Sequence, residues 1–424
     1  MTMAAVAGVS ALGSRKPHSL VRESRRAGPL VLLLALFCST GCQVSRVPQL
    51  TTAEIQKAID AGGTISIPAG TYLLTQTLVV TKSHTIIQGS GPDTVFVFKP
   101  TLPQVHCVND RAFTTACGIV DTPHRRIAAP IAVGDTSFTA DGDVSDLQRG
   151  DWLVVADFDG VPGEVVVIDW VQVEATEGND VIIQTPFRTA FFDLRPWDPV
   201  RSGLGFRKVP DLIEGTQFRD FSLVVPDSGQ DAPGISVFAA KDTVVENISV
   251  QDADGQALYS YLSKGLTITE CQSTTGSVLS ELGATVDLKL NANTFGSDSG
   301  VALGLDFGTA FFQMTGNNID SSVDIGMYLL DGIHDGTVTN NSIAFVSSSG
   351  AYNAGNAVGI LIRGTQRVNV TDNFLAGGSG PASIGLSIGT AYSLDVPMLS
   401  SGNTVEPNRF GLQWGVDYDP SNAP

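Results

Sequence analysis

The chain has 424 residues, of which 42% are hydrophobic and 16% charged, and its formal net charge is −18. Such an acidic chain lacks the surplus of lysine and arginine that a phosphate backbone requires, which excludes nucleic acid as a partner. The 45 glycines and the few charges favour a protein built from strands and tight turns.

Residues 1–41 have the composition of an export signal. Five basic residues between Arg15 and Arg26 precede the apolar run Leu30–Phe37, which is too short to span a membrane comfortably. The Ser-Thr-Gly-Cys that follows is similar to the lipidation motif of bacterial lipoproteins and ends at Cys42. We expect an exported protein, held in the bacterial cell envelope by a lipid on Cys42 or secreted after plain cleavage. Contact with a membrane is expected only through this N-terminal signal or anchor.

Removal of residues 1–41 would leave 20 cations and 42 acids, a net charge of −22. A surface this acidic repels a polyanion unless Ca²⁺ or a local basic patch intervenes. Ca²⁺ is therefore the one cofactor that stays open, although the sequence assigns no ligands to it. No cluster of cysteine and histidine residues has the spacing of a zinc site.

The first folded segment, residues 51–127, opens with an amphipathic helix. Thr52 is placed to cap this helix and Gly62–Gly63 to end it. The face that we expect to be buried comprises Ile55, Ala58 and Ile59. Further along, Cys107 and Cys117 could form a disulfide in an oxidising compartment, and two unpaired thiols are the alternative. Cys271 is predicted to lie in the core.

Residues 128–192 read as four or five antiparallel strands joined by glycine and aspartate turns. This insertion is either a structural flap or one wall of a glycan-binding groove. The stretch from residue 186 to residue 208 that follows is rich in arginine and aromatic residues, which pair with carboxylates and stack on sugar rings. Its substrate-binding candidates are Arg195, Trp197, Arg201 and Arg207. The alternative is a packed linker in which these arginines pair with Asp193 and Asp198.

Within residues 193–415 one short phrase recurs seven times. Aligned on a polar position, its copies are separated by 24, 22, 24, 24, 32 and 30 residues. The aligned residues are Asn247, Cys271, Asn293, Asn317, Asn341, Asn373 and Asn403. A repeat of this length with no amphipathic helix between the copies predicts a β-helix, a stack of coils made of short strands. Asparagines at one position of successive coils can then hydrogen-bond along the stack.

A second phrase, a short alternating stretch that begins with glycine, falls between the copies of the first. Its alignment predicts two rows of outward-facing side chains on one sheet. The first row is Asp306, Tyr328, Leu361, Ser387 and Gln413. The second is Gly308, Leu330, Arg363 and Gly389.

The two phrases and the opening helix resemble the right-handed parallel β-helix superfamily, which contains the pectate lyases and polygalacturonases. The resemblance covers residues 51–415 and implies an all-β, right-handed parallel β-helix with a capping helix, followed by a flexible tail at residues 416–424. By analogy of fold it implies a polysaccharide as partner. The catalytic motifs of the polygalacturonases and the arginine and paired-aspartate signature of the pectate lyases are absent from the chain. The sequence from Asp331 to Gly336 is only loosely similar to the Asp-Pro-His of alginate epimerases.

Six residues are expected to gather over three or four coils as catalytic candidates: Glu281, Asp306, Tyr328, Asp331, His334 and Arg363. Neighbouring carboxylates could be the acid and base of glycoside hydrolysis, and their crowding would keep one of them protonated. Alternatively, Tyr328, His334 or Arg363 could take the proton in a β-elimination on a uronate. Ordinary solvated side chains on outer turns are the third interpretation.

We therefore predict an exported polysaccharide-active enzyme that acts on an acidic glycan, with a lyase favoured over a hydrolase. A carbohydrate epimerase is one alternative. The other is a non-catalytic surface protein that binds glycan or is purely structural.

Overall fold

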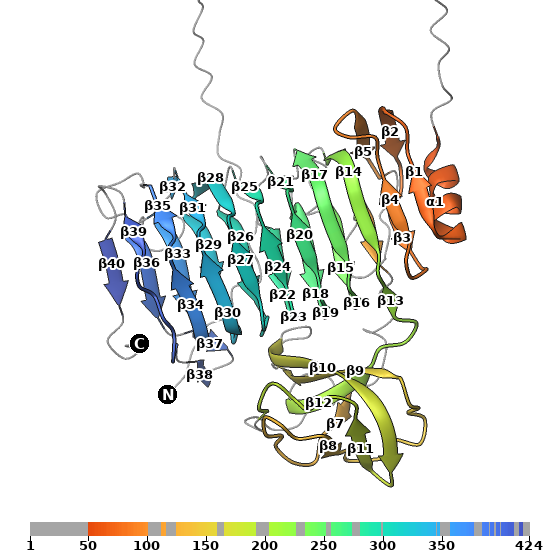
Figure 1. The fold of residues 1–424 in the computed structure, drawn as a ribbon, viewed down its shortest axis with the longest axis vertical. Helices are drawn as coiled ribbons and strands as arrows, with labels where there is room; N and C mark the ends of the chain where they lie inside the picture. Colours follow the sequence, from red (N-terminus) through yellow and green to blue (C-terminus); the bar gives the residue numbers. More distant parts are fainter. Residues whose placement is uncertain are drawn as a thin grey trace, which may run out of the picture. The chain divides into compact units, whose positions relative to one another are not determined.

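In a computed structural model the chain winds into a right-handed parallel β-helix, which confirms the predicted fold (Figure 1). The structure describes residues 50–100, 112–115, 124–158, 165–191, 203–225, 234–251, 256–273, 280–297, 300–344, 346–347, 357–376, 384–389, 391–393, 396–398, 400–410 and 415–418. Among these residues, no helix combines the length and the hydrophobicity that a membrane crossing requires.

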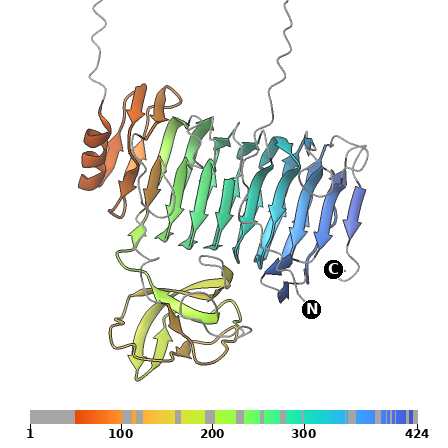
Figure 2. The same cartoon turned by 180° about the vertical axis from the view of Figure 1, so that it is seen from behind.

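One face of the β-helix is a parallel sheet of ten strands, to which each successive coil adds one strand (Figures 1 and 2). The strands are β3 (Leu78–Val80), β6 (Phe113–Thr115), β15 (Ile235–Phe238), β18 (Leu258–Tyr261), β22 (Ser280–Gly283), β26 (Val301–Asp306), β29 (Ile325–Leu329), β33 (Val358–Arg363), β36 (Ile384–Gly389) and β40 (Gly415–Tyr418). The last strand includes residues 416–418, so the coils extend into the segment that was expected to be a flexible tail.

The other faces of the coils form a second large sheet and a short one, again with parallel pairing. The large sheet consists of β1 (Thr64–Ser66), β2 (Gly70–Leu74), β4 (Ile86–Gln88), β5 (Thr94–Phe98), β14 (Gln217–Val224), β17 (Val244–Gln251), β20 (Thr267–Thr269), β21 (Gln272–Ser273), β24 (Lys289–Asn291), β25 (Thr294–Gly296), β27 (Gln313–Thr315), β28 (Asn318–Val323), β30 (His334–Thr339), β31 (Ser342–Ile343), β32 (Val346–Ser347), β34 (Gln366–Thr371), β35 (Phe374–Leu375) and β39 (Arg409–Phe410). The short sheet consists of β13 (Ile213–Glu214), β16 (Ala240–Lys241), β19 (Ser263–Lys264) and β23 (Thr285–Val286). A separate antiparallel ribbon pairs β37 (Ala391–Ser393) with β38 (Val396–Met398).

The helix α1 (Thr52–Ala61) begins one residue before the position that the sequence predicted. Thr51 is its N-cap: the Thr51 hydroxyl accepts a bond from the Glu54 N–H (3.3 Å), and the Glu54 carboxylate accepts one from the Thr51 N–H (2.8 Å). Thr52, the expected cap, is buried and donates to a backbone carbonyl of β2. The two adjacent threonines are equivalent as caps, and the glutamate three residues after Thr51 decides between them. The helix ends at Gly62 as predicted.

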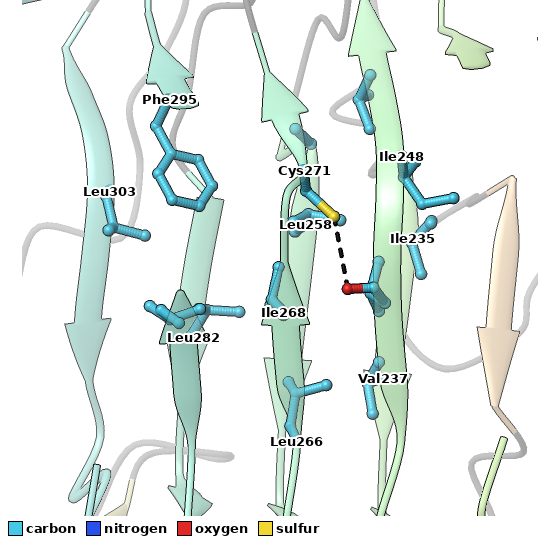
Figure 3. Packing of buried hydrophobic residues seen from close by; sticks show 14 of the residues in the cluster. Ile235, Val237, Ile248, Leu258, Leu266, Ile268, Cys271, Leu282, Phe295 and Leu303 are labelled. Carbon is cyan, nitrogen blue, oxygen red and sulfur yellow. Dashed lines mark hydrogen bonds between the residues drawn. The ribbon is translucent and has the colours of Figure 1, made fainter. Parts of the chain in front are cut away.

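The interior of the β-helix is apolar, and α1 adds the fully buried Ile55 and Ile59 to its first coil. A close view shows side chains from opposite sheets packed in one cluster: Ile235, Val237, Leu258, Leu282 and Leu303 with Ile248, Leu266, Ile268 and Phe295 (Figure 3). Cys271 lies among them as predicted, and its thiol donates to the Val245 carbonyl (3.5 Å). Burial raises the pKa of this thiol to about 12, so Cys271 is a core residue and not a nucleophile.

The insertion is a six-stranded antiparallel sheet with its own apolar core. In spatial order its strands are β7 (Arg125–Arg126), β12 (Gly203–Lys208), β9 (Trp152–Phe158), β10 (Val165–Glu177), β11 (Asp180–Ile183) and β8 (Ser137–Thr139). It therefore spans residues 125–208, which is wider than the expected 128–192. The difference arises because β12 pairs with both β7 and β9, although its sequence reads as a linker.

A ladder of asparagines runs along one corner of the coils. Asn293, Asn317, Asn341 and Asn373 are at most 1% exposed, and each amide donates to the side-chain oxygen of the asparagine in the next coil (2.9–3.0 Å). Each amide also donates to a backbone carbonyl. The ladder thus satisfies backbone groups that would otherwise be buried and unpaired at every corner.

The two ends of the ladder differ from the predicted alignment. Asn247 lies one position earlier, in a left-handed turn (φ 52°) where its amide donates to Asp220, and Ile248 is the residue aligned with Cys271. At the other end Asn408 occupies the ladder, whereas Asn403 lies in another turn and accepts a bond from a backbone N–H of β34. Asparagine suits both the ladder and the left-handed turn beside it, so the sequence alone could not separate the two positions.

Replacement of Asn317 by alanine should lower the free energy of unfolding by about 2–4 kcal/mol, because it leaves several buried groups without partners. Chemical unfolding followed by circular dichroism measures this change. Asn369, which is exposed on β34, is the matched control, and Asn369→Ala should change stability by less than about 0.5 kcal/mol. Equal effects of the two substitutions would show that the ladder does not stabilise the stack.

Candidate active site: an acid cluster on the outer face of the ten-stranded sheet

The strand pairing sets two rows of outward-facing side chains on the ten-stranded sheet. The inward residues between them, such as Leu282 and Leu305, lie in the core. The first row is Tyr259, Glu281, Gly304, Tyr328, Leu361 and Ser387. The second row, two residues on, is Gly283, Asp306, Leu330, Arg363 and Gly389.

The sequence therefore placed Asp306 in the wrong row. The alignment of the second phrase matched Gly304 with Gly326. In the structure, the pairing of β26 with β29 is shifted by two residues, and Gly304 lies opposite Tyr328. Asp306 is consequently diagonal to Tyr328 and next to Gly283. Asp306 is likewise diagonal to Glu281, which lies opposite Gly304.

Glu281, Asp306 and Tyr328 form a connected cluster. The Tyr328 hydroxyl donates to Asp306 Oδ2 (3.1 Å), and the amide of Gln256 donates to the Glu281 carboxylate. Asp306 is 5% exposed, and its buried Oδ1 accepts no hydrogen bond from an N–H or hydroxyl group of the described residues. A proton held between Asp306 and Glu281 would satisfy that oxygen.

The surroundings favour the protonated forms of these groups. Burial, followed by the charges of Glu281 and Asp331, raises the pKa of Asp306 well above its ordinary value. Burial also raises the pKa of Glu281. For Tyr328, burial and then the Asp306 carboxylate raise the pKa well above 10.0, so the phenol keeps its proton. Two neighbouring acids cannot both ionise at low cost, so the pair keeps one proton to a higher pH than separate carboxyl groups would.

Asp331 belongs to this cluster through its charge on Asp306 and Tyr328. It lies at the corner that follows the ten-stranded sheet, where successive coils place one residue in the left-handed region (φ 45–52°). The corner residues are Ala239, Leu262, Ala284, Phe307 and Asp331. Because this corner recurs in every coil, Asp331 is held next to the end of the strand that carries Asp306.

Two glycines leave the space that the cluster occupies. A Cβ on Gly304 would collide with the ring of Tyr328, which therefore lies directly over that strand. A Cβ on Gly283 would be 2.7 Å from Asp306 Oδ1 and 2.6 Å from the ring of Phe307. Any larger residue at either position would displace a member of the cluster.

The insertion packs beside the cluster. Val154, Ala156, Ile168 and Trp170 of β9 and β10 share an apolar cluster with residues of the coils, among them Tyr261. The ring of Tyr261 in turn lies 6.3 Å from that of Phe307, the neighbour of Asp306.

Arg188 fastens the insertion to the coils. Its guanidinium lies 2.6 Å from Asp287 and 3.4 Å from the buried Asp169, and it stacks 4.0 Å above the ring of Phe311. The insertion thus adjoins the end of the cluster next to Phe307.

The other predicted site residues lie apart from this cluster. His334 is 3% exposed and contacts Asp335 and Phe311 across the corner. Arg363 lies further along the second row. Arg207 is half-buried at the insertion, where burial lowers its pKa, and it is no free surface cation.

Several predicted residues lie outside the described part of the chain: Arg195, Trp197, Arg201, Cys42, Cys107 and Cys117. The described residues contain no group of three or more histidine, cysteine, aspartate or glutamate side chains arranged to hold a metal ion.

Sequence reasoning missed Gln256, Gly283, Gly304 and Arg188. The glycines left a signal, since each interrupts a strand in which the neighbouring coils carry large side chains. Gln256 left none, because it reaches its partner in the next coil. Arg188 stands in the arginine-rich stretch that the sequence singled out, but its partners Asp287 and Asp169 were not predicted.

Replacement of Asp306 by asparagine should stabilise the protein, and increasingly so as pH rises. The folded-state pKa of Asp306 is raised, so the wild type loses stability as pH rises from about 3.8, its ordinary pKa, to the folded value. The Tm of Asp306→Asn should therefore match the wild type below about pH 4 and exceed it at pH 7.

Asp335 provides a control of opposite sign. Burial opposes its ionisation, but hydrogen bonds from Arg367 and His334 outweigh burial and lower its pKa. Asp335→Asn should thus lower the Tm at pH 7, and this loss should disappear as pH falls. A Tm difference for Asp306→Asn that does not vary with pH would contradict the raised pKa.

No protein-family model and no curated protein match the chain. Among solved structures, it is similar to the tailspike protein gp49 from Pseudomonas phage LKA1, with 15% identity and a TM-score of 0.49 over 79% of this chain and 55% of the tailspike. For the A-module of the Azotobacter vinelandii mannuronan C-5 epimerase AlgE6 the identity is 11% and the TM-score 0.47, over 87% and 94% of the two chains. For PfbA, a surface adhesin of Streptococcus pneumoniae, they are 13% and 0.41, over 85% and 86%. The chain spans 55% and 59% of the two Pseudomonas phage tailspikes that it matches, and the likeness concerns the fold alone.

Proposed function

We propose that the protein is a glycoside hydrolase that cleaves a polysaccharide at the acid cluster. One observation carries the proposal: the buried Asp306 and the partly buried Glu281 form a carboxyl pair with raised pKa values on the outer face of the sheet. Glycoside hydrolysis needs one protonated carboxyl group to donate to the leaving oxygen and one carboxylate on the other side of the bond.

The residues of the cluster can fill both roles. The proton of the Asp306–Glu281 pair serves as the general acid, and the more exposed Asp331 serves as the base or nucleophile. Tyr328 holds Asp306 through its hydroxyl and restricts the direction in which the proton leaves. Gln256 does the same for Glu281. An acid kept protonated by burial and by neighbouring carboxylates suits proton donation near neutral pH.

The same cluster favours a hydrolase over the lyase that the sequence placed first. A lyase needs a base for the sugar proton and a group that neutralises the uronate carboxylate. Tyr328 keeps its own proton, so it is a poor base at neutral pH. Of the other two candidates, His334 bonds to Asp335 and packs on Phe311, and Arg363 lies two coils along from Asp306.

A purely binding or structural surface is the less favoured alternative, because the acid cluster lowers the stability of the folded protein. Buried carboxyl groups with raised pKa values reduce stability at neutral pH, and a surface that only binds sugar does not need them. A local group of side chains that lowers stability, on a sheet whose strands are otherwise well paired, favours a catalytic role for that group.

Export belongs to this proposal and is supported by the basic and apolar pattern of residues 1–41. A lipid on Cys42 would hold the enzyme in the bacterial envelope, which contains polysaccharides. Plain cleavage would release it.

Purified protein incubated with a panel of neutral and acidic polysaccharides should produce new reducing ends without ultraviolet-absorbing unsaturated sugars. Asp306→Asn and Glu281→Gln should each lower kcat/KM by about 10²–10⁴-fold, the usual contribution of a general acid. The wild-type rate should fall as pH rises through the pKa of the pair. Unsaturated products would instead establish a lyase, and binding without any product would establish a non-catalytic protein.

Two glycine variants separate geometry from stability. Gly304→Ala should abolish most of the activity, because the new methyl group displaces Tyr328. Gly389→Ala on the same sheet is the milder comparison and should retain much more activity, since its Cβ would meet only the Arg363 side chain, at an ordinary contact distance of 3.5 Å or more. Full activity in Gly304→Ala would contradict the placement of the site.

A further inference from the structure

We propose that Arg363 forms a subsite for the carboxylate of an acidic sugar, two coils along the second row from Asp306. The inference rests on the proposed function and names the substrate class of that site. It changes the role of Arg363 from a catalytic candidate to a residue that binds and positions the glycan.

The guanidinium of Arg363 is available to a ligand. It ends β33, is half-buried, and its Nε is buried without a hydrogen-bond partner. Its Cγ, Cδ and Nε lie 3.5–3.8 Å from where a Cβ of Gly389 would be, so the side chain extends over the neighbouring coil, where a glycine leaves it room. None of the carboxylates that the structure describes forms an ion pair with it.

Most of the other arginines that the structure describes are paired with carboxylates, as expected in an acidic chain. Those that form ion pairs with carboxylates are Arg125, Arg126, Arg149, Arg188, Arg219 and Arg367. A half-buried guanidinium with a buried, unsatisfied donor gains most from a ligand that brings its own acceptor. The planar fork of arginine matches a carboxylate bidentately.

The position along the sheet fits a polymer bound parallel to the stack of coils. Asp306, Leu330 and Arg363 are consecutive members of the second row. With coils about 4.8 Å apart, Arg363 lies about 10 Å from Asp306, too far to act on the same bond but within reach of a neighbouring sugar of the same chain. The cation also offsets, at this one place, the repulsion that the acidic protein exerts on an anionic glycan.

Affinity electrophoresis of the full chain tests the subsite without any need for turnover. Gels carry pectate or alginate, with methyl-esterified pectin as the uncharged counterpart, and every variant is made in the Asp306→Asn background. Arg363→Gln should weaken binding to pectate or alginate about tenfold to a hundredfold, the loss expected for hydrogen bonds to a charged group, and should leave binding to esterified pectin unchanged. Arg363→Lys should restore binding only in part, because it keeps the charge and loses the fork.

Arg409, an exposed arginine of β39 that forms no ion pair with the described residues, is the matched control, and Arg409→Gln should bind as the parent does. Equal losses for Arg363→Gln and Arg409→Gln, or no loss for Arg363→Gln, would overturn the subsite. Binding and cleavage of neutral glycans alone would also overturn it, while leaving the proposed hydrolase intact. Failure to bind or cleave any glycan would overturn both.

Discussion

The in-register stacking of one coil on the next is the constraint on which the rest of the structure depends. Each short strand can satisfy its backbone N–H and C=O groups only through the strands above and below it. At the corners, where no strand exists, the buried asparagines from Asn293 to Asn408 take over that task. The register therefore holds around the whole coil and not only within the sheets.

The acid cluster is a consequence of this register. Outward side chains of adjacent coils are held about 4.8 Å apart, which is close enough for carboxyl groups to repel each other strongly when they are shielded from water. In most of the row the structure avoids such contacts. At Glu281 and Asp306 it creates one, and the glycines at 283 and 304 leave room for it. The candidate site thus lies where glycines replace large side chains in the two outward rows.

The repeat predicted the fold, because spacing and strand-like pattern are properties of sequence alone. It could not fix the register to the residue, since asparagine is favoured both on the ladder and at the turn before it, as Asn247 shows. A separate error of two residues, in the alignment of the second phrase, moved Asp306 between rows. The residues between 331 and 334 show a further limit. A corner separates Asp331 from His334, so side chains three positions apart in the sequence end in different environments. The ion pair of Arg188 with Asp287 depends on how the insertion folds and packs against the coils, and the repeat pattern contains no information about that.

The central claim is that the Asp306–Glu281 pair holds a proton at neutral pH in the folded protein. Infrared difference spectroscopy between the wild type and Asp306→Asn tests it most directly, because the carbonyl stretch of a protonated carboxyl group is separate from the bands of carboxylates. At pH 7 the wild type should show a protonated carboxyl band that the variant lacks. Spectra in which both proteins contain only ionised carboxylates at that pH would contradict the claim, and with it the assignment of the site.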